Sequence, residues 1–179
     1  ALSIREDRDN FDYICSVAGL AELGGKEYRH IRREINRCKR AAPLMAEPIS
    51  PENLEIVRQL TLQWHNMPMS QKSWEYSDTG PALMAAAWFQ ELGLSGSLFS
   101  DGTRYTGYII GSELSPDTYG IHFSKCLDKT RGAEYYCKNL FCQSLGGYEY
   151  LNLGQDMGLA GLRERKTLLN PVSQIPVYK

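Results

Sequence analysis

One stretch, residues 148–166, limits what this chain can fold into more than any other. Aromatic and aliphatic side chains over 148–153 predict a buried strand, since such residues favour the half-buried surface of a sheet. The strand ends in a polar corner bounded by Gly154 and Gly158, which can take backbone angles closed to other residues. Chemistry in α/β folds commonly sits at the end of such a strand. The stretch is therefore either a functional corner or a capped turn followed by a solvated basic segment.

Four charged side chains are expected to meet at this corner. Asp156 lies between the two glycines, and Arg163 and Lys166 follow three residues apart, so a helical segment would put both on one face. Lys125 ends an earlier strand that should run beside this one after a helical crossover. We therefore expect one cleft with three cations and one carboxylate, suited to an anionic ligand that also bears an amine. An internal salt-bridge cluster is the alternative, and it needs only two of the four groups.

The length and composition are those of a single domain. The 179 residues and 42% hydrophobic content provide for a sizeable core, so we expect one domain over residues 1–179. No apolar run approaches membrane-spanning length and no signal peptide is visible, which points to a cytoplasmic chain. The cysteines are odd in number and lack CxxC spacing, which favours free thiols over a disulfide scaffold or a metal site. They are Cys15, Cys38, Cys126, Cys137 and Cys142.

Residues 26–40 predict an amphipathic helix with a basic face. Its apolar residues recur at spacings of three and four and so form one stripe. Seven Lys or Arg residues stand in this segment against two Glu, and most of them face away from the apolar stripe. A solvated charged face is the ordinary explanation of such a pattern. The one-sided charge favours a ligand with several phosphates instead, and the candidate binding residues are Arg29, Arg33 and Arg37.

The rest of the chain predicts a mixed sheet flanked by helices. Strands are expected at 11–17, 44–49, 96–100, 105–111, 118–127 and 171–178, and helices at 50–64, 81–92 and 133–145. Helices, then an antiparallel run, then a strand–loop–helix–strand unit fit an α/β or α+β fold with an acyltransferase-like topology. Within the strand 118–127, His122 is expected to be a hydrogen-bonded core or scaffold residue, with a general base as the alternative.

The loop 128–133 is a candidate cofactor site. Acyltransferases of the GNAT type hold the pyrophosphate of coenzyme A on the amides of a loop that opens a helix, where the helix dipole favours an anion. Lys129, Arg131 and Gly132 are the candidate binding residues for acetyl-CoA or another acyl-CoA. The GNAT pattern has Gly or Ala where this chain has Glu134. The match is therefore partial, and no tightly bound cofactor is expected.

Three blocks of the chain resemble, in order, the phosphatidylglycerol lysyltransferase C-terminal domain family. They are residues 20–37, residues 120–133 and residues 152–172. The most specific block is Gln155-Asp156-x-Gly158-x-x-Gly161-Leu162-Arg163-x-x-Lys166. The resemblance implies a GNAT-like acyl-CoA N-acyltransferase fold, with a mostly antiparallel mixed sheet. It also implies that the chain corresponds to the C-terminal half of a tandem-GNAT protein whose N-terminal half is missing here.

The same resemblance implies a function. Characterised members of the family move an aminoacyl group from tRNA to a lipid hydroxyl, which would make tRNA and an anionic lipid head group the partners, at the inner membrane surface. The arginines of the basic helix would meet phosphates, and Asn152 and Arg163 would bind substrate. Lys125 and Lys166 would offset charge on a phosphate or on the developing oxyanion, and Asp156 would recognise the α-ammonium or orient the attacking group.

Two departures from the family pattern leave other functions open. Ser124 stands where the family usually has an acid, and Leu153-Gly154 stands where it tends to have Arg-Glu. Both changes fit an altered substrate or a degenerate site. An acetyl-CoA-dependent N-acetyltransferase is one alternative to aminoacyl transfer. A non-catalytic domain of the same fold that binds an anion or nucleic acid is the other.

Overall fold

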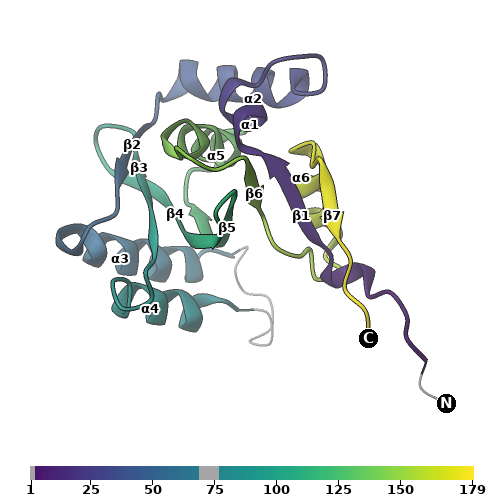
Figure 1. Ribbon diagram of the computed structural model, residues 1–179. Coiled ribbons are helices and arrows are strands. Elements are labelled where there is room, and N and C mark those ends of the chain that lie inside the picture. Colours follow the sequence, from purple (N-terminus) through teal and green to yellow (C-terminus); the bar gives the residue numbers. More distant parts are fainter. Residues whose placement is uncertain (1–2, 69–76) are drawn as a thin grey trace.

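The computed structural model describes residues 3–68 and 77–179. The strands of the described residues form one sheet, in the order β2-β3-β4-β5-β6-β1-β7 (Figure 1). They are β1 (Asp12–Ser16), β2 (Met45–Pro48), β3 (Ser95–Ser100), β4 (Tyr105–Ser115), β5 (Thr118–Cys126), β6 (Tyr150–Asn152) and β7 (Ser173–Ile175). Neighbouring strands pair antiparallel except β5 and β6, which are parallel. The sheet is therefore mixed and mostly antiparallel, as the sequence predicts.

Helices cover both faces of this sheet (Figure 1). One layer consists of α1 (Val17–Glu22), α2 (Arg29–Ala41) and α5 (Ala133–Ser144). The other consists of α3 (Leu54–His65) and α4 (Thr79–Ala87), and α6 (Ala160–Leu168) follows the corner after β6. Each layer encloses its own hydrophobic core. Ile109 and Ile110, adjacent in β4 and both fully buried, contribute to different cores because successive side chains of a strand point to opposite faces.

The parallel pair β5 and β6 opens towards its C-terminal end. Among the described residues their ladder joins only Thr118–Gly120 to Tyr150–Asn152. β5 continues to Cys126, whereas the chain after β6 turns away towards Asp156. The α5 helix provides the crossover that parallel neighbours require. The loop 128–132 and the corner 153–158 therefore lie at the same end of the sheet, on strands that separate.

Several element boundaries differ from the prediction. The basic helix begins at Arg29 because residues 25–28 form a turn, and the helix predicted at 81–92 spans Thr79–Ala87. The predicted last strand shrinks to Ser173–Ile175 because Pro176 has no N–H to donate to a ladder. The segment 160–168 is helical, so Arg163 and Lys166 do share one helix.

Candidate functional site

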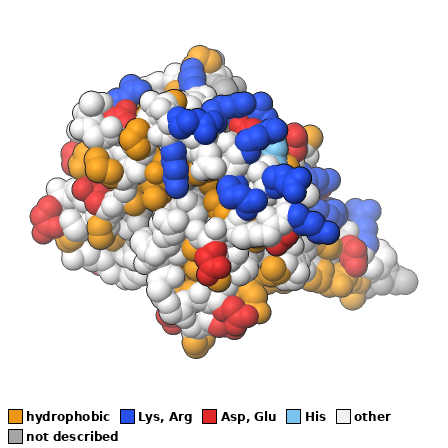
Figure 2. Space-filling view, turned by 90° about the horizontal axis from the view of Figure 1, so that it is seen from above, with side chains coloured by type: hydrophobic (Ala, Val, Ile, Leu, Met, Phe, Trp, Pro, Cys, Tyr) orange, Lys and Arg blue, Asp and Glu red, His pale blue; other side chains and the backbone are white. Residues whose placement is uncertain are grey.

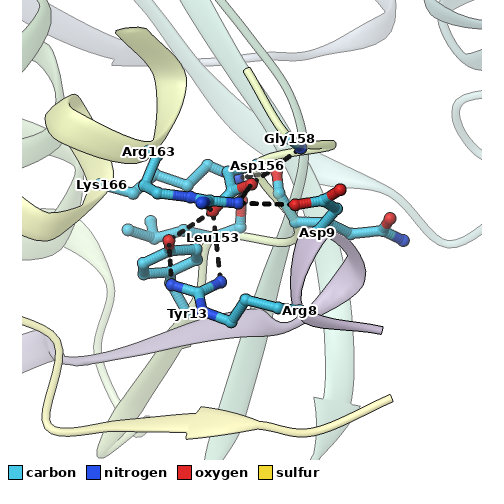
Figure 3. Close-up of polar contacts among 9 residues, drawn as sticks. Arg8, Asp9, Tyr13, Leu153, Asp156, Gly158, Arg163 and Lys166 are labelled. Atoms are coloured by element: carbon cyan, nitrogen blue, oxygen red, sulfur yellow. Dashed lines mark hydrogen bonds and ion pairs between the residues drawn. The ribbon is translucent and has the colours of Figure 1, made fainter. Parts of the chain in front are cut away.

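The corner after β6 is built around the carboxylate of Asp156, which is fully buried (Figure 3). Arg163 donates from Nε to Oδ2 at 2.8 Å and from Nη2 to Oδ1 at 2.9 Å. The Tyr13 hydroxyl donates to Oδ2 at 2.5 Å, and the Gly158 amide donates to Oδ1 at 2.9 Å. Arg8, from a 3-10 turn near the N-terminus, lies 3.3 Å from Oδ2. Segments far apart in the sequence thus meet on one side chain.

This network keeps Asp156 ionised, and its hydrogen bonds use both carboxylate oxygens. The hydrogen bonds from Arg163 are the largest cause that holds its pKa well below the usual range, and those from Tyr13 and Gly158 add to it. Since both oxygens have donors and none of the side chain is exposed, a ligand reaches the carboxylate only if the network opens. The structure therefore shows an internal salt-bridge cluster around Asp156. Direct contact between Asp156 and a substrate stays a prediction.

Lys166 reaches the same corner from α6 (Figure 3). Its Nζ donates to the carbonyl oxygens of Leu153 at 2.6 Å and Gln155 at 2.5 Å, and it lies 5.8 Å from the centroid of the Tyr13 ring. Burial, together with the nearby charge of Lys138 on α5, lowers its pKa to about 8. An ammonium has three N–H donors, so one remains beyond the two carbonyls. Lys166 is thus a cation held at the corner after β6, between the two carbonyls and the Tyr13 ring of β1.

Asn152 shapes the corner rather than facing it. The side chain is 7% exposed; its amide donates to Asp12 at 2.9 Å, and its oxygen accepts from the amide of Gly154 at 2.7 Å. Gly154 follows with φ of +67°, a conformation that favours glycine. The predicted substrate-binding role of Asn152 stays a prediction. Its contacts in the structure fix the turn that carries the two carbonyls around Lys166.

The expectation that Lys125 shares a cleft with this corner is wrong. Lys125 is 4% exposed, pairs with Asp78, and lies with Nζ 4.0 Å from the centroid of the Trp64 ring of α3. Its cross-strand partner Tyr108 belongs to the core under α3 and α4. Lys166 instead lies over Tyr13, on the face covered by α5. The sequence could not show this, because the partners of Lys125 are distant in the chain and lie on the opposite face of the sheet.

The predicted basic helix and the predicted cofactor loop meet at one residue. Glu34 of α2 is 1% exposed and pairs with Arg131 of the loop at 2.8 Å, with Arg37 at 3.4 Å and with Arg33 at 3.6 Å. The three arginine side chains are between 51% and 67% exposed, and Arg29 is exposed as well. Lys and Arg side chains gather on the face seen from above, where α2 lies (Figure 2).

A pocket of about 340 Å³ lies beside this surface, at the start of α5. Its lining includes Lys129, Gly132 and Glu134, together with Arg165 of α6, whose Nε lies 3.8 Å from Glu134 Oε2. Glu134 pairs with Lys138 at 2.8 Å, and the charge of Lys138 is the largest cause that lowers the pKa of Glu134. An ionised carboxylate therefore lines the pocket.

These residues do not fit the pyrophosphate of an acyl-CoA. The amide of Thr130 donates to the Asp128 carboxylate at 2.7 Å, and the amide of Ala133 donates to the Thr130 carbonyl at 3.0 Å. Two amides that would hold a phosphate are thus already used, and the Glu134 carboxylate would repel it. The alternative of an acetyl-CoA-dependent enzyme therefore loses its main structural argument.

His122 differs from the prediction in its exposure. Its side chain is exposed rather than in a core, and its Nε2 lies 2.8 Å from the Ser112 hydroxyl on β4. The hydrogen-bonded part of the prediction agrees with this contact. All five cysteines are free thiols, and burial raises the pKa of Cys15 and Cys142 to about 12, as expected of inert core thiols.

Three important residues escaped the sequence reasoning: Arg8, Tyr13 and Glu34. Glu34 carried a signal, because it lies three residues after Ile31 and so falls on the apolar stripe of its helix. A carboxylate in a core position implies a partner. Arg8 belongs to a visible run of charges near the N-terminus, but no pattern connects that run to Asp156.

The chain matches a known protein family along its whole length. The family model described as "Phosphatidylglycerol lysyltransferase, C-terminal" matches residues 1–179. A conserved protein of unknown function from Bacteroides thetaiotaomicron is 27% identical with a TM-score of 0.91, over 98% of this chain and 60% of that one. No curated protein matches the chain. None of the helices in the described part of the chain is long and apolar enough to cross a membrane.

Two further solved structures share the fold at lower identity. The C-terminal domain of a putative lysylphosphatidylglycerol synthetase from Agrobacterium fabrum is 19% identical with a TM-score of 0.69. L-PGS from Bacillus licheniformis is 16% identical with a TM-score of 0.64. Each match covers 98% of this chain, which spans 60% of the length of these relatives. The expected fold class, a mixed and mostly antiparallel sheet flanked by helices, is confirmed. Because the family model matches the chain from end to end, the protein belongs to the family of phosphatidylglycerol lysyltransferase C-terminal domains.

Proposed function

We propose that this domain transfers an aminoacyl group from aminoacyl-tRNA to a hydroxyl of an anionic lipid such as phosphatidylglycerol. The observation that carries the proposal is the convergence of arginines from α2 and from the loop 128–132 on one face, beside the opening of the sheet. Membership of the family supports an acyltransferase role. Since the donor is a cytoplasmic RNA and the acceptor is a lipid, the reaction belongs at the inner membrane surface.

The chemistry assigns separate tasks to the two parts of the site. The acceptor oxygen attacks the ester carbonyl carbon, the bond to the tRNA ribose oxygen breaks, and the hydroxyl proton ends on that oxygen. Exposed arginines such as Arg33 and Arg37 would bind tRNA phosphates. The third N–H of Lys166 would stabilise the oxyanion that forms on the carbonyl. Asp156 would act through Arg163 and Tyr13, which it holds in place, rather than on the substrate itself.

Charge reversal of the basic helix tests the first task. The double variant Arg29→Glu and Arg33→Glu leaves the apolar stripe of α2 intact, so it should fold as the parent does. It should bind an RNA hairpin with an unpaired 3′ tail at least about tenfold more weakly. The slope of log affinity against log salt concentration should fall by the equivalent of about two phosphate contacts. Arg58→Glu is the matched control, since Arg58 is 48% exposed on α3, away from this face. Equal RNA affinity of the double variant and the parent at every salt concentration would contradict the proposal.

A transfer assay tests the second task. Labelled amino acid is followed from aminoacyl-tRNA into phosphatidylglycerol vesicles. Lys166→Met should reduce transfer at least about tenfold while RNA affinity stays within about twofold of the parent, because the phosphate contacts lie elsewhere. Full RNA binding by the parent with no transfer to any lipid would instead identify a non-catalytic RNA-binding domain.

A further inference from the structure

Glu34 is a buried carboxylate at the centre of an exposed group of arginines. Oε2 accepts from Arg37 Nη1 at 3.4 Å and lies 2.8 Å from Arg131 Nε, while Oε1 lies 3.6 Å from Arg33 Nη2. Among the described residues, Oε1 has no hydrogen-bond partner although it is buried. A side chain needed only for packing at this position would be apolar, as Ile31 and Ile35 are on the same stripe. The carboxylate at this position is therefore explained by its ion pairs with the arginines.

The loop is held against the same turn of α2 by Gly132. Its φ of +94° favours glycine, and a Cβ at this position would lie 2.4 Å from the backbone oxygen of Glu34. The backbone preceding α5 thus rests directly on the turn that carries the carboxylate. Arg131 enters the group from this loop, whereas Arg33 and Arg37 come from α2. One residue joins the cationic side chains of two elements.

We propose that Glu34 is a positioning residue that holds Arg33, Arg37 and Arg131 as one site for consecutive phosphates of an RNA chain, an inference that rests on the proposed function. Each guanidinium has five N–H donors in a fixed fork. Glu34 takes one N–H of Arg37 through Nη1 and pairs with Nε of Arg131, while Nη2 of Arg33 is held by charge at 3.6 Å. The three side chains are between 51% and 67% exposed, so their other donors remain for a ligand. Side chains fixed in advance lose less conformational freedom on binding, so the phosphates are bound more tightly.

Charge alone predicts the opposite effect, which makes the proposal testable by sign. Glu34→Gln removes one negative charge from the basic face. If the arginines act only as a diffuse positive field, the variant should bind an anion more tightly. If Glu34 positions them, the variant should bind more weakly despite its higher positive charge. Glu27→Gln is the matched control, because Glu27 is exposed just before α2 and has the same charge.

The experiment measures affinity for the RNA hairpin with an unpaired 3′ tail over a series of salt concentrations. Glu34→Gln should bind the RNA about five- to tenfold more weakly. The slope of its log affinity against log salt concentration should fall by the equivalent of about one to two phosphate contacts. Glu27→Gln should bind the RNA equally or up to about twofold more tightly. Tighter or unchanged binding by Glu34→Gln would overturn the proposal and leave the proposed function intact. Thermal unfolding of each variant verifies that it is folded at the temperature of the measurement.

Two further measurements separate the remaining outcomes. If Glu34→Gln does not fold, Arg131→Gln is compared with Lys129→Gln on the same loop; a larger loss for Arg131→Gln supports positioning, and equal losses overturn it. Stabilisation by inorganic tripolyphosphate, measured as a shift in melting temperature, is the second probe. If the parent binds tripolyphosphate in a way that depends on Glu34 but does not bind RNA, the result supports a phosphate site positioned by Glu34 and overturns the proposed function. A parent that binds neither would overturn both.

Discussion

Asp156 connects more of the chain than any other charged residue of the corner, and removing its charge should show this. Asp156→Asn keeps the shape but leaves Arg163 and Arg8 facing a neutral amide in a buried position. We expect a loss of about 2–4 kcal/mol in the free energy of unfolding, measured by urea titration. Asp9→Asn is the control, since Asp9 pairs with the same Arg163 at 2.8 Å but is 58% exposed, and it should barely change stability. Equal losses in the two variants would contradict the role given to burial.

Lys166 gives the corner a dependence on pH with a defined sign. Its folded pKa is lowered from 10.5 to about 8, so between these values the unfolded chain holds more protons than the folded one. Stability contributed through this group therefore rises as the pH rises from 8 to 10.5. Lys166→Met lacks the titration but keeps the other lysines and tyrosines. The difference in urea stability between parent and variant should shift in favour of the parent from pH 8 to pH 10, and a constant difference would contradict the lowered pKa.

How much of the site could be predicted depends on how local each contact is. Arg163 and Lys166 could be placed together because they are three positions apart in one helix, and Asp156 lies just ahead of the same helix. The Glu34 cluster joins α2 to a loop almost a hundred residues away, and Lys125 meets partners from α3 and the start of α4. Such contacts follow from the tertiary fold, and the charges that form them look like ordinary surface charges in sequence.

At the scale of elements, the contact between α2 and the loop before α5 requires glycine at position 132. Gly132→Ala combines a positive φ with a Cβ that would meet the backbone of Glu34, so something must move. We expect a loss of at least about 2 kcal/mol in the free energy of unfolding. Gly161→Ala is the matched control, because a Cβ there meets nothing within 4 Å inside α6, and it should gain up to about 1 kcal/mol. If both variants gained stability, the close contact would not exist.

The same element also shows why patterns predict helices better than their ends. The apolar stripe of α2 identified the helix, but its first residue depends on a turn over residues 25–28 that has no periodic signal. At α4 the apolar composition continues past Ala87, yet the chain leaves the helix and reaches a positive φ at Gly93. The strand β6 is only three residues long because it pairs with β5 just at the point where the two separate. The two helix boundaries thus follow local turns that carry no periodic signal, and the strand boundary follows from a tertiary neighbour.

The whole molecule is a single sheet with a core on each face, so its two layers should unfold together. Ile109 and Ile110 are both fully buried in the central strand β4, one in each core. Ile109→Ala and Ile110→Ala should each cost about 2–4 kcal/mol. Because β4 belongs to both layers, neither core can remain intact when the strand is lost, and each variant should unfold in one transition.

Two probes on one urea titration test this cooperativity. Of the tryptophans in the described residues, Trp64 lies in α3 and Trp88 directly follows α4. Their fluorescence therefore reports the layer of α3 and α4, which encloses the core that contains Ile110. Far-UV circular dichroism reports the helices of both layers. For Ile109→Ala, whose cavity lies in the opposite core, the two midpoints should fall together and move by the same amount from the parent. A fluorescence midpoint that stays at the parental value while the dichroism midpoint falls would show that the α3 and α4 layer unfolds independently of the layer that carries the candidate site.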